Sequence, residues 1–365
     1  MQTPPSVPVV ISGLGLCTAL GDSVSSTWQA LLAGRLITDH WRVPLNLPQP
    51  RVNSLARRVA LEACGNAGWN RDQLRSAALI VGTSKGPVEA WLERMTEMAA
   101  VTAPSNFLSS TSTYVASELE METGPRLTIS TACASGLHAL IRAVMLLRES
   151  RVDRALVVAA ESSLHPLFIG SFRRLGVLAP PELGCRPFDR DRAGFLVSEG
   201  AAAVCLERAA KPGIQIDRFA IGGDGSHLTH GDPTGRTLRR LLAEVLGDRP
   251  IDLIHAHATG TKTNDSLELA AIQSVLATGD VNFPPALYSH KGALGHSLGA
   301  AGLVAVVLNC LCHAESRIPP NLQSKRPLTM DRVEFSQTVS VRSIKRSIAV
   351  AAGFGGPVAV VSLIG

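Results

Sequence analysis

Short apolar runs alternate with helical periodicity along most of this chain, and that alternation limits the folds open to it. Residues 9–13 read as a buried strand, and residues 24–32 repeat apolar side chains at helical spacing. The same succession recurs at residues 127–129 and 137–147. Strands that alternate with helices form mainly parallel sheets covered on both faces. We therefore expect an α/β fold built largely from parallel strands.

The length of 365 residues exceeds the size at which single hydrophobic cores stop growing, about 250–300 residues. Residues 207–213 are charged and end in proline and glycine, which makes them the best boundary between two halves. We expect an N-terminal half over residues 1–210 and a C-terminal half over residues 214–365. The second half repeats the alternation, and residues 350–360 read as two strands joined by a glycine-rich turn. No sequence repeat between the halves is visible.

Composition excludes several classes of protein. Seven irregularly spaced cysteines do not form a disulfide framework in a chain of this size, which indicates a reducing, cytoplasmic setting. We find no basic, apolar leader and no run approaching the ~20 apolar residues of a membrane span. The net charge of +5 comes from scattered arginines, so we expect no nucleic acid partner. A docking site for an acidic protein and an ordinary solvated surface both remain open.

Cys133 stands between a strand pattern and a helix pattern, within Thr-Ala-Cys-Ala-Ser-Gly at residues 131–136. A sulfur at a helix N-terminus experiences roughly half a positive charge, which favours thiolate over thiol. Cys133 is therefore a candidate nucleophile. A small buried cysteine with no chemical role is the alternative.

His257 ends the apolar run at residues 251–256, and the carboxyl ends of parallel strands are where α/β proteins place ligands. The alternative is that His257 is a histidine of the core with satisfied hydrogen bonds. For His255, which lies deeper in the strand, we prefer this core role over a ligand-binding one. Glu268 on the following helix either orients a histidine or lysine or lies on the helix surface. Asp265 is a candidate cap for that helix.

Lys291 and His296 lie on a glycine-studded turn at residues 289–302, before a strongly apolar helix. Small flanking residues favour a buried, paired lysine over a solvated one. Residues 353–356 could present backbone N–H groups to a developing oxyanion. Cys310 and Cys312 sit two apart in an apolar helix and so face different directions, which favours packing over a metal site.

Together these motifs, in this order, resemble the β-ketoacyl-acyl-carrier-protein synthases of the thiolase superfamily. The resemblance extends over nearly the whole chain. It includes Ile-Ser-Gly-Leu-Gly at residues 11–15 and Arg-Pro-Phe-Asp-Arg-Asp-Arg-Ala-Gly-Phe at residues 186–195. It implies a five-layered αβαβα fold of two similar halves with the active site at their junction.

The resemblance also implies a role for each motif. Cys133 would accept the acyl chain, and His257 and His296 would bind malonyl thioester and promote its decarboxylation. Lys291 and Glu268 match the family's supporting lysine and glutamate. A second histidine at position 296 is typical of elongating synthases. The remaining expected site residues are the oxyanion-hole amides of Cys133 and Phe354, the cavity residue Ala352, and the phosphopantetheine-binding hydroxyls of Thr259 and Thr261.

The expected reaction is decarboxylative condensation of an acyl chain with malonyl-acyl-carrier protein, in fatty-acid-like or polyketide synthesis. The resemblance implies a homodimer, with a heterodimer possible, and an acyl carrier protein as partner. It implies no metal and no dissociable cofactor, since the carrier brings its own phosphopantetheine. The alternatives are a non-elongating acyltransferase or decarboxylase, and a partner subunit of a heterodimeric synthase.

One departure from the family pattern concerns the C-terminal turn. The fatty-acid branch commonly has an aromatic residue two positions before Phe354, where this chain has Ala352. We expect the cavity beside Cys133 to be enlarged or reshaped, with an acyl preference that Ala352→Phe would change.

Overall fold

A computed structural model describes residues 7–97, 107–208, 212–229, 231–277 and 283–365. The strands are β1 (Val9–Thr18), β2 (Ala78–Gly82), β3 (Arg126–Ile129), β4 (Arg154–Glu161), β5 (Gly200–Arg208), β6 (Gln215–Gly223), β7 (Leu253–His255), β8 (Ala286–Tyr288), β9 (Arg317–Ile318), β10 (Ser340–Val341), β11 (Arg346–Ala352) and β12 (Pro357–Ile364). The helices are α1 (Val24–Leu32), α2 (Arg51–Ala67), α3 (Arg71–Ser76), α4 (Val88–Glu97), α5 (Ser110–Glu118), α6 (Ser135–Arg148), α7 (Pro166–Arg174), α8 (Arg236–Leu246), α9 (Lys262–Leu276), α10 (Lys291–Leu294), the short 3-10 helix η2 (Leu298–Ala300) and α11 (Ala301–Glu315).

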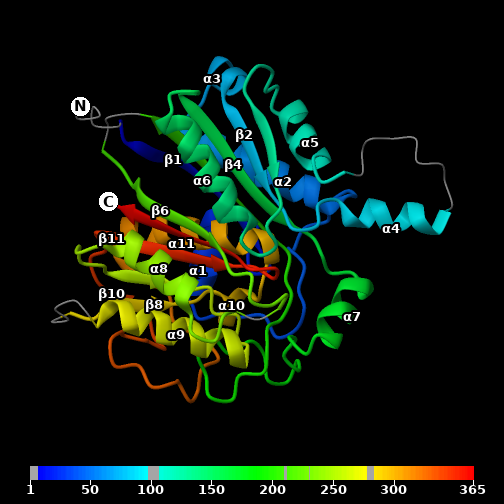
Figure 1. Cartoon of the computed structure of the whole chain (residues 1–365). Coiled ribbons are helices and arrows are strands. Elements are labelled where there is room, and N and C mark those ends of the chain that lie inside the picture. Colours follow the sequence, from blue (N-terminus) through cyan, green and yellow to red (C-terminus); the bar gives the residue numbers. More distant parts are fainter. Residues whose placement is uncertain (1–6, 98–106, 209–211, 230, 278–282) are drawn as a thin grey trace.

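The sheet has the same strand order in each half, reflected about its centre. Its ten strands run β3-β2-β4-β5-β1-β6-β12-β11-β7-β8 (Figure 1). Taken in chain order, β1 to β5 therefore correspond to β6, β7, β8, β11 and β12. The two five-stranded sets meet where β1 pairs with β6 through Val10 and Gln215. The topology repeats although no repeat is visible in the sequence.

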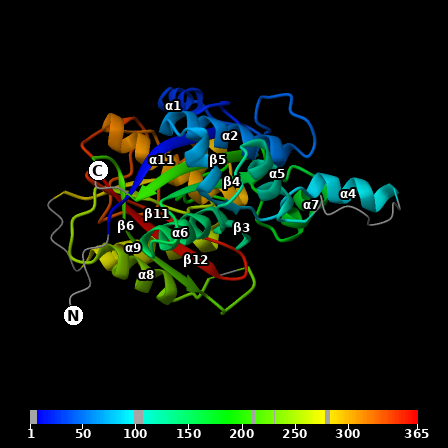
Figure 2. The ribbon, with the colours of Figure 1, turned by 90° about the horizontal axis from the view of Figure 1, so that it is seen from above.

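Helices form three layers around these two sets of strands (Figure 2). On one outer face, α2 packs on β1, β4 and β5, and α5 packs on β2 and β3. On the other outer face, α8 packs on β6 and β12 and contacts α9. In the middle, α6 and α11 contact each other and strands of both sets. The arrangement confirms the expected thiolase-like αβαβα architecture.

The expectation of mainly parallel sheets is wrong. β2 pairs in parallel with β3 and β4, and β7 with β8 and β11, but β5 and β12 run antiparallel to both of their neighbours. β12 returns directly from β11 through a tight turn, and a long irregular segment precedes β5. Neither connection is the helical crossover that parallel pairing needs. Buried strands read alike in either orientation, so composition does not reveal the direction.

Leu298–Glu315, which combines η2 and α11, is the one helical stretch in the described ranges with the length and apolarity to cross a membrane. The sequence-based statement that no run approaches a membrane span is therefore too strong. Within this stretch 78% is buried inside the fold. Packing between the two sets of strands accounts for its apolar character, because a helix in the middle layer has no solvent face.

Candidate active site

A tight turn between β3 and α6 holds Cys133. The hydroxyl of Ser135 accepts a hydrogen bond from the amide of Thr131 (2.9 Å) and donates to the carbonyl of Ala132 (2.6 Å). Ala132 has φ +48°, a left-handed conformation that is strained for a residue with a side chain. The turn therefore fixes the backbone on both sides of a half-buried sulfur.

The glycine turn between β11 and β12 lies directly against this backbone. A Cβ at Gly353 would lie 3.1 Å from the amide nitrogen of Cys133 and 2.8 Å from the carbonyl oxygen of Thr131. Only a glycine allows this approach. It places Phe354, the next residue, beside the Cys133 turn, where an oxyanion hole would need both amides. Among the described residues, the Phe354 amide has no hydrogen-bond acceptor.

His257 follows β7 on a loop that Glu268 anchors. The buried carboxylate accepts hydrogen bonds from the amides of His257 (2.6 Å) and Ala258 (2.7 Å). These bonds stabilise Ala258 at φ +33°. Glu268 is thus a buried residue rather than a surface one, and it orients the backbone of His257 instead of its imidazole.

Lys291, at the start of α10, is buried and donates from its ammonium to the carbonyl of His257. Burial lowers the pKa of Lys291, and the negative charge of Glu268 acts in the opposite direction. The lysine therefore places a positive charge behind the His257 loop. The first residues of the expected glycine-studded turn form a short helix there.

His296 lies between His257 and a phenylalanine of the preceding half. Its ring centroid is 5.5 Å from that of His257 and 5.0 Å from that of Phe195, both in edge-to-face contacts. Its backbone bonds to the carbonyl of Leu196 (2.7 Å) and the amide of Ser198 (3.1 Å). The irregular segment before β5 therefore positions an imidazole of the C-terminal half.

A cavity of about 430 Å³ brings most of the expected residues together. Residues from both halves line it, including Cys133, His257, Thr259, Thr261, His296, Ala352 and Phe354. Lys291 and Glu268 lie behind this wall, where they contact the His257 backbone. The hydroxyls of Thr259 and Thr261 are 3.1 Å apart. The structure thus places the sulfur and both imidazoles on one cavity.

The electrostatics of the cavity differ from the sequence-based expectation for Cys133. Burial raises the pKa of its thiol to about 12, although the charges of Lys291 and Lys85 lower it. The expectation that the helix N-terminus favours the thiolate is therefore not met at the resting sulfur, because desolvation raises the pKa of the thiol by more than the nearby positive charges lower it. Burial also lowers the pKa values of His257 and His296 well below the ordinary range, and Lys291 lowers them further. Both imidazoles are neutral near pH 7.

Two further residues support the His257 loop and were missed or misassigned from the sequence. Asp265 does not cap its helix, because Thr261 is the N-cap of α9. Its buried carboxylate instead accepts from the amides of Phe188 (2.8 Å) and Gly260 (3.1 Å). Arg192 donates to the carbonyl of Thr261 (3.0 Å). Residues 186–195, which carry part of the family resemblance, thus support the His257 loop through Phe188 and Arg192.

His255 is the core histidine that we preferred on sequence grounds. Its Nδ1 lies 2.8 Å from the side-chain oxygen of Asn309, and its Nε2 lies 2.8 Å from Nδ1 of His290. Both nitrogens have partners away from the cavity. Cys310 and Cys312 are buried in α11, as packing residues are.

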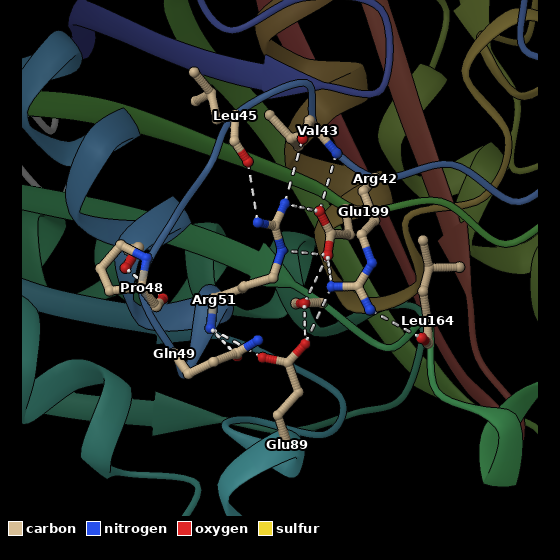
Figure 3. A network of polar contacts seen from close by, with 11 residues as sticks. Arg42, Val43, Leu45, Pro48, Gln49, Arg51, Glu89, Leu164 and Glu199 are labelled. Carbon is tan, nitrogen blue, oxygen red and sulfur yellow. Dashed lines mark hydrogen bonds and ion pairs between the residues drawn. The ribbon is translucent and has the colours of Figure 1, made fainter.

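A buried ion pair supports the segment next to His296 (Figure 3). Arg51 makes a two-pronged contact with Glu199, at 2.9 and 2.7 Å, and neither side chain is appreciably exposed. Glu199 also accepts from the amide of Val43 (2.9 Å) and the hydroxyl of Ser162 (2.8 Å). The network attaches the proline-rich residues 39–50 to the start of β5.

Two family models match this chain. The model for "Beta-ketoacyl synthase, N-terminal domain" matches residues 48–211, and that for "Beta-ketoacyl synthase, C-terminal domain" matches residues 214–325. Together they cover most of the chain, including the sulfur and both imidazoles of the cavity.

Relatives and solved structures agree with the family models. The chain is 29% identical to a 3-oxoacyl-[acyl-carrier-protein] synthase 2 of Coxiella burnetii, over 87% of this chain and 89% of that protein. It is 32% identical to a putative polyketide beta-ketoacyl synthase 1 of Streptomyces cyaneus, over 66% and 61%. A type II polyketide ketosynthase in complex with its acyl-carrier protein (25% identity) and the ishigamide ketosynthase/chain length factor (26%) each superpose with a TM-score of 0.86, covering 98% of this chain and 99% of theirs. The chain belongs to the β-ketoacyl synthase family and has its thiolase-like fold.

Proposed function

We propose that this protein is an elongating β-ketoacyl-acyl-carrier-protein synthase that condenses an acyl chain with malonyl-acyl-carrier protein. The observation that carries this proposal is the convergence of Cys133, His257 and His296 on one cavity lined by both halves. A nucleophile beside two neutral imidazoles suits acyl transfer followed by decarboxylation. Family membership supports the same reaction.

In the first step, the Cys133 sulfur attacks the carbonyl of the acyl thioester. Because the resting thiol has a raised pKa, its proton has to leave as the sulfur attacks, and a neighbouring neutral imidazole accepts it. The carbonyl oxygen becomes negative between the amides of Cys133 and Phe354. Collapse of this intermediate releases the carrier thiol, which takes up the proton.

In the second step, the malonyl thioester loses carbon dioxide. The carbon–carboxylate bond breaks, and the electron pair becomes an enolate whose oxygen faces His257 and His296. Neutral imidazoles suit this task because each can donate an N–H to the enolate oxygen without transferring the proton completely. The enolate carbon attacks the acyl group on Cys133, and the sulfur leaves as a thiolate. It takes up one proton from solvent, which balances the negative charge of the malonyl carboxylate that left as carbon dioxide.

The carrier's phosphopantetheine arm has a route along this cavity. Thr259 and Thr261 offer hydroxyls to its amides. Exposed Arg173 and Arg174 precede the cavity residue Leu175, and exposed Lys262 is itself part of the lining. These cations suit an acidic carrier domain, because opposite charge speeds diffusional encounter.

A homodimer is supported by a difference between the two edges of the sheet. At the β8 edge, the amide of Leu287 donates a hydrogen bond to the backbone carbonyl of Glu334 (2.8 Å), so this edge already has a partner. At the other edge, no strand among the described residues covers β3. An uncovered edge is a template for pairing with another chain. We expect sedimentation of the purified protein to give a dimer, and a monomer would contradict this assembly.

A heterodimeric role is the second candidate, because one structural neighbour is described as a ketosynthase/chain length factor. Retention of Cys133 and both histidines favours the catalytic subunit of such a pair.

All seven cysteines are free, which fits a reducing cytoplasm.

The proposed function is tested by intact-mass measurement after the protein is mixed with a panel of acyl-carrier proteins. We expect an acyl adduct in the wild type and none in Cys133→Ala, whereas the matched Cys310→Ala, at a packed site, still loads. Adding malonyl-carrier protein to the loaded enzyme should then give a β-ketoacyl product. An adduct that persists in Cys133→Ala would contradict the assignment of the nucleophile.

A further inference from the structure

Lys85 occupies the first-half counterpart of the position that carries His257. It lies on the loop after β2, and β2 corresponds to β7 in the reflected strand order. Both loops leave the carboxyl ends of parallel strands, where α/β proteins place functional groups. The topology therefore makes Lys85 a candidate functional residue, although no sequence motif marks it.

Buried hydrogen bonds fix the Lys85 loop next to the Cys133 turn. The carboxylate of Glu161 accepts from the hydroxyl of Thr83 (3.2 Å) and from the amide of Ser84. A Cβ at Gly82 would lie 2.7 Å from the carbonyl oxygen of Ser135, so the loop touches the start of α6. The lysine thus projects from a rigid base close to the nucleophile.

The ammonium of Lys85 rests on aromatic rings. Its Nζ is 5.0 Å from the ring centroid of Phe168 and 5.7 Å from that of Phe172, both on α7. Phe172 is 5.7 Å from Phe195, which packs against His296. In the ranges that the structure describes, no carboxylate or carbonyl forms a hydrogen bond or an ion pair with this ammonium, although Glu161, whose pKa burial raises, is close enough for the charge of Lys85 to lower that pKa. Ring faces leave its N–H donors available to a ligand.

The charge of Lys85 acts on the Cys133 sulfur. It is one of the two cations that lower the pKa of the thiol against the effect of burial. Lys291, the other cation, is already bonded to the His257 carbonyl. Of the two cations, Lys85 is therefore the one whose N–H donors have no acceptor among the described residues.

We propose that Lys85 selects the acyl group that Cys133 accepts, favouring groups with a carboxylate or keto oxygen near the thioester over plain hydrocarbon chains. The inference rests on the proposed acyl transfer to Cys133. A hydrocarbon gains nothing from the cation, whereas an oxygen acceptor forms a charge-assisted hydrogen bond with it.

Three acyl groups of equal length test this selection. Butyryl, acetoacetyl and succinyl thioesters of N-acetylcysteamine are offered singly, and the initial rate of Cys133 acylation is followed by intact mass. We expect acetoacetyl, succinyl or both to load about tenfold faster than butyryl, the size of one charge-assisted hydrogen bond. The faster of the two identifies the oxygen that Lys85 prefers.

Variants separate the charge from other effects. Lys85→Leu and Lys85→Gln should load all three groups at similar rates, Lys85→Arg should keep the preference, and Lys325→Leu, which removes an exposed lysine, should behave as the wild type. Circular dichroism shows which variants fold, and either neutral variant suffices. A wild-type preference retained in a folded neutral variant would overturn the proposal, as would equal loading by the wild type.

A second readout does not depend on acyl transfer. The ratio of Cys133 alkylation rates by iodoacetate and iodoacetamide reports local charge, because only iodoacetate is anionic. We expect Lys85→Leu to lower that ratio about fivefold, and an unchanged ratio would refute an effect of this charge at the sulfur. Failure of all three thioesters to load would contradict the proposed function, while the alkylation ratio would still decide the role of Lys85.

Discussion

The turn after β3 and the turn after β8 occupy equivalent positions in the two halves, and each leads into a helix of the middle layer. The first, residues 130–134, is short, made mostly of small residues, and presents a half-buried sulfur. The second, residues 289–300, is buried throughout and carries Lys291 and His296. One scaffold position thus supplies a nucleophile in one half and positive charge with hydrogen-bond donors in the other.

The largest expected effects come from substitutions that separate acyl loading on Cys133 from condensation. Cys133→Ala should abolish acyl loading. His257→Ala and His296→Ala should still load, because each variant keeps one imidazole to accept the Cys133 proton. Both should lose condensation by about a thousandfold, because the enolate loses one of its two donors. Loading is measured by intact mass and condensation by product formation. A His296→Ala variant that loses loading as completely as Cys133→Ala would show that the two turns do not divide the reaction in this way.

The support of the second turn is tested by the Arg51 ion pair. Arg51→Met leaves the buried carboxylate of Glu199 without its main partner, which should lower the free energy of unfolding by about 3–5 kcal/mol. Arg57→Met is the matched control, since its pair with Glu118 is substantially exposed and should contribute less than about 1 kcal/mol. Urea denaturation measures both, and equal losses would refute the structural role of Arg51.

The anchored loop of His257 should make stability depend on pH. Burial raises the pKa of Glu268 from 4.5 to about 7. Between these values the folded protein keeps a proton on Glu268 that the unfolded chain releases, so the contribution of Glu268 to the free energy of unfolding should fall as pH rises, by roughly 3 kcal/mol. The buried imidazoles of His257 and His296, whose pKa values are lowered, contribute with the opposite sign below pH 6.5.

Glu268→Gln removes that contribution and leaves those of the histidines in place. The difference in free energy of unfolding between wild type and variant, measured by urea denaturation, should therefore fall by roughly 3 kcal/mol from pH 4.5 to pH 7. Asp265, whose pKa burial raises to about 6, contributes with the same sign as Glu268 but is present in both proteins, so it cancels in the difference. A difference that stays constant across this range would contradict the assignment to Glu268.

The smallest expected effect concerns Ala352, beside the Phe354 amide. Ala352→Phe fills part of the cavity and should change the relative loading rates of long and short acyl groups by about tenfold, the size of hydrophobic pocket discrimination. Competition between two acyl-carrier proteins, read by intact mass, measures the ratio. An unchanged ratio and rate would mean that residue 352 does not shape the acyl site.

The alternation of strands and helices, the terminal hairpin and the residues around the cavity could be predicted, because periodicity and short motifs are local. The antiparallel placement of β5 could not, since a strand such as residues 201–206 is apolar in either direction. The contacts of Asp265 and Lys85 join residues far apart in sequence, Asp265 with Phe188 and Lys85 with Phe168. The sequence around Lys85, a serine before it and a glycine after it, gives no indication of these long-range contacts.

The thiol state of Cys133 was mispredicted for a related reason. The helix N-terminus is visible in the sequence pattern, but the desolvation of Cys133 depends on how apolar side chains from other elements pack around it. Tertiary packing determines how deeply such a residue is buried, and a local sequence pattern does not show it.

The central claim is that one cavity performs both acyl transfer and decarboxylative condensation. The most direct measurement is a single turnover in which acyl-loaded enzyme meets isotope-labelled malonyl-carrier protein, with carbon dioxide and carrier-bound product quantified together. We predict equal amounts of carbon dioxide and of a β-ketoacyl product two carbons longer. The protein should then return to its unmodified mass, with Cys133 free of the acyl group. Carbon dioxide without that product, or an acyl adduct that persists on Cys133, would contradict the account.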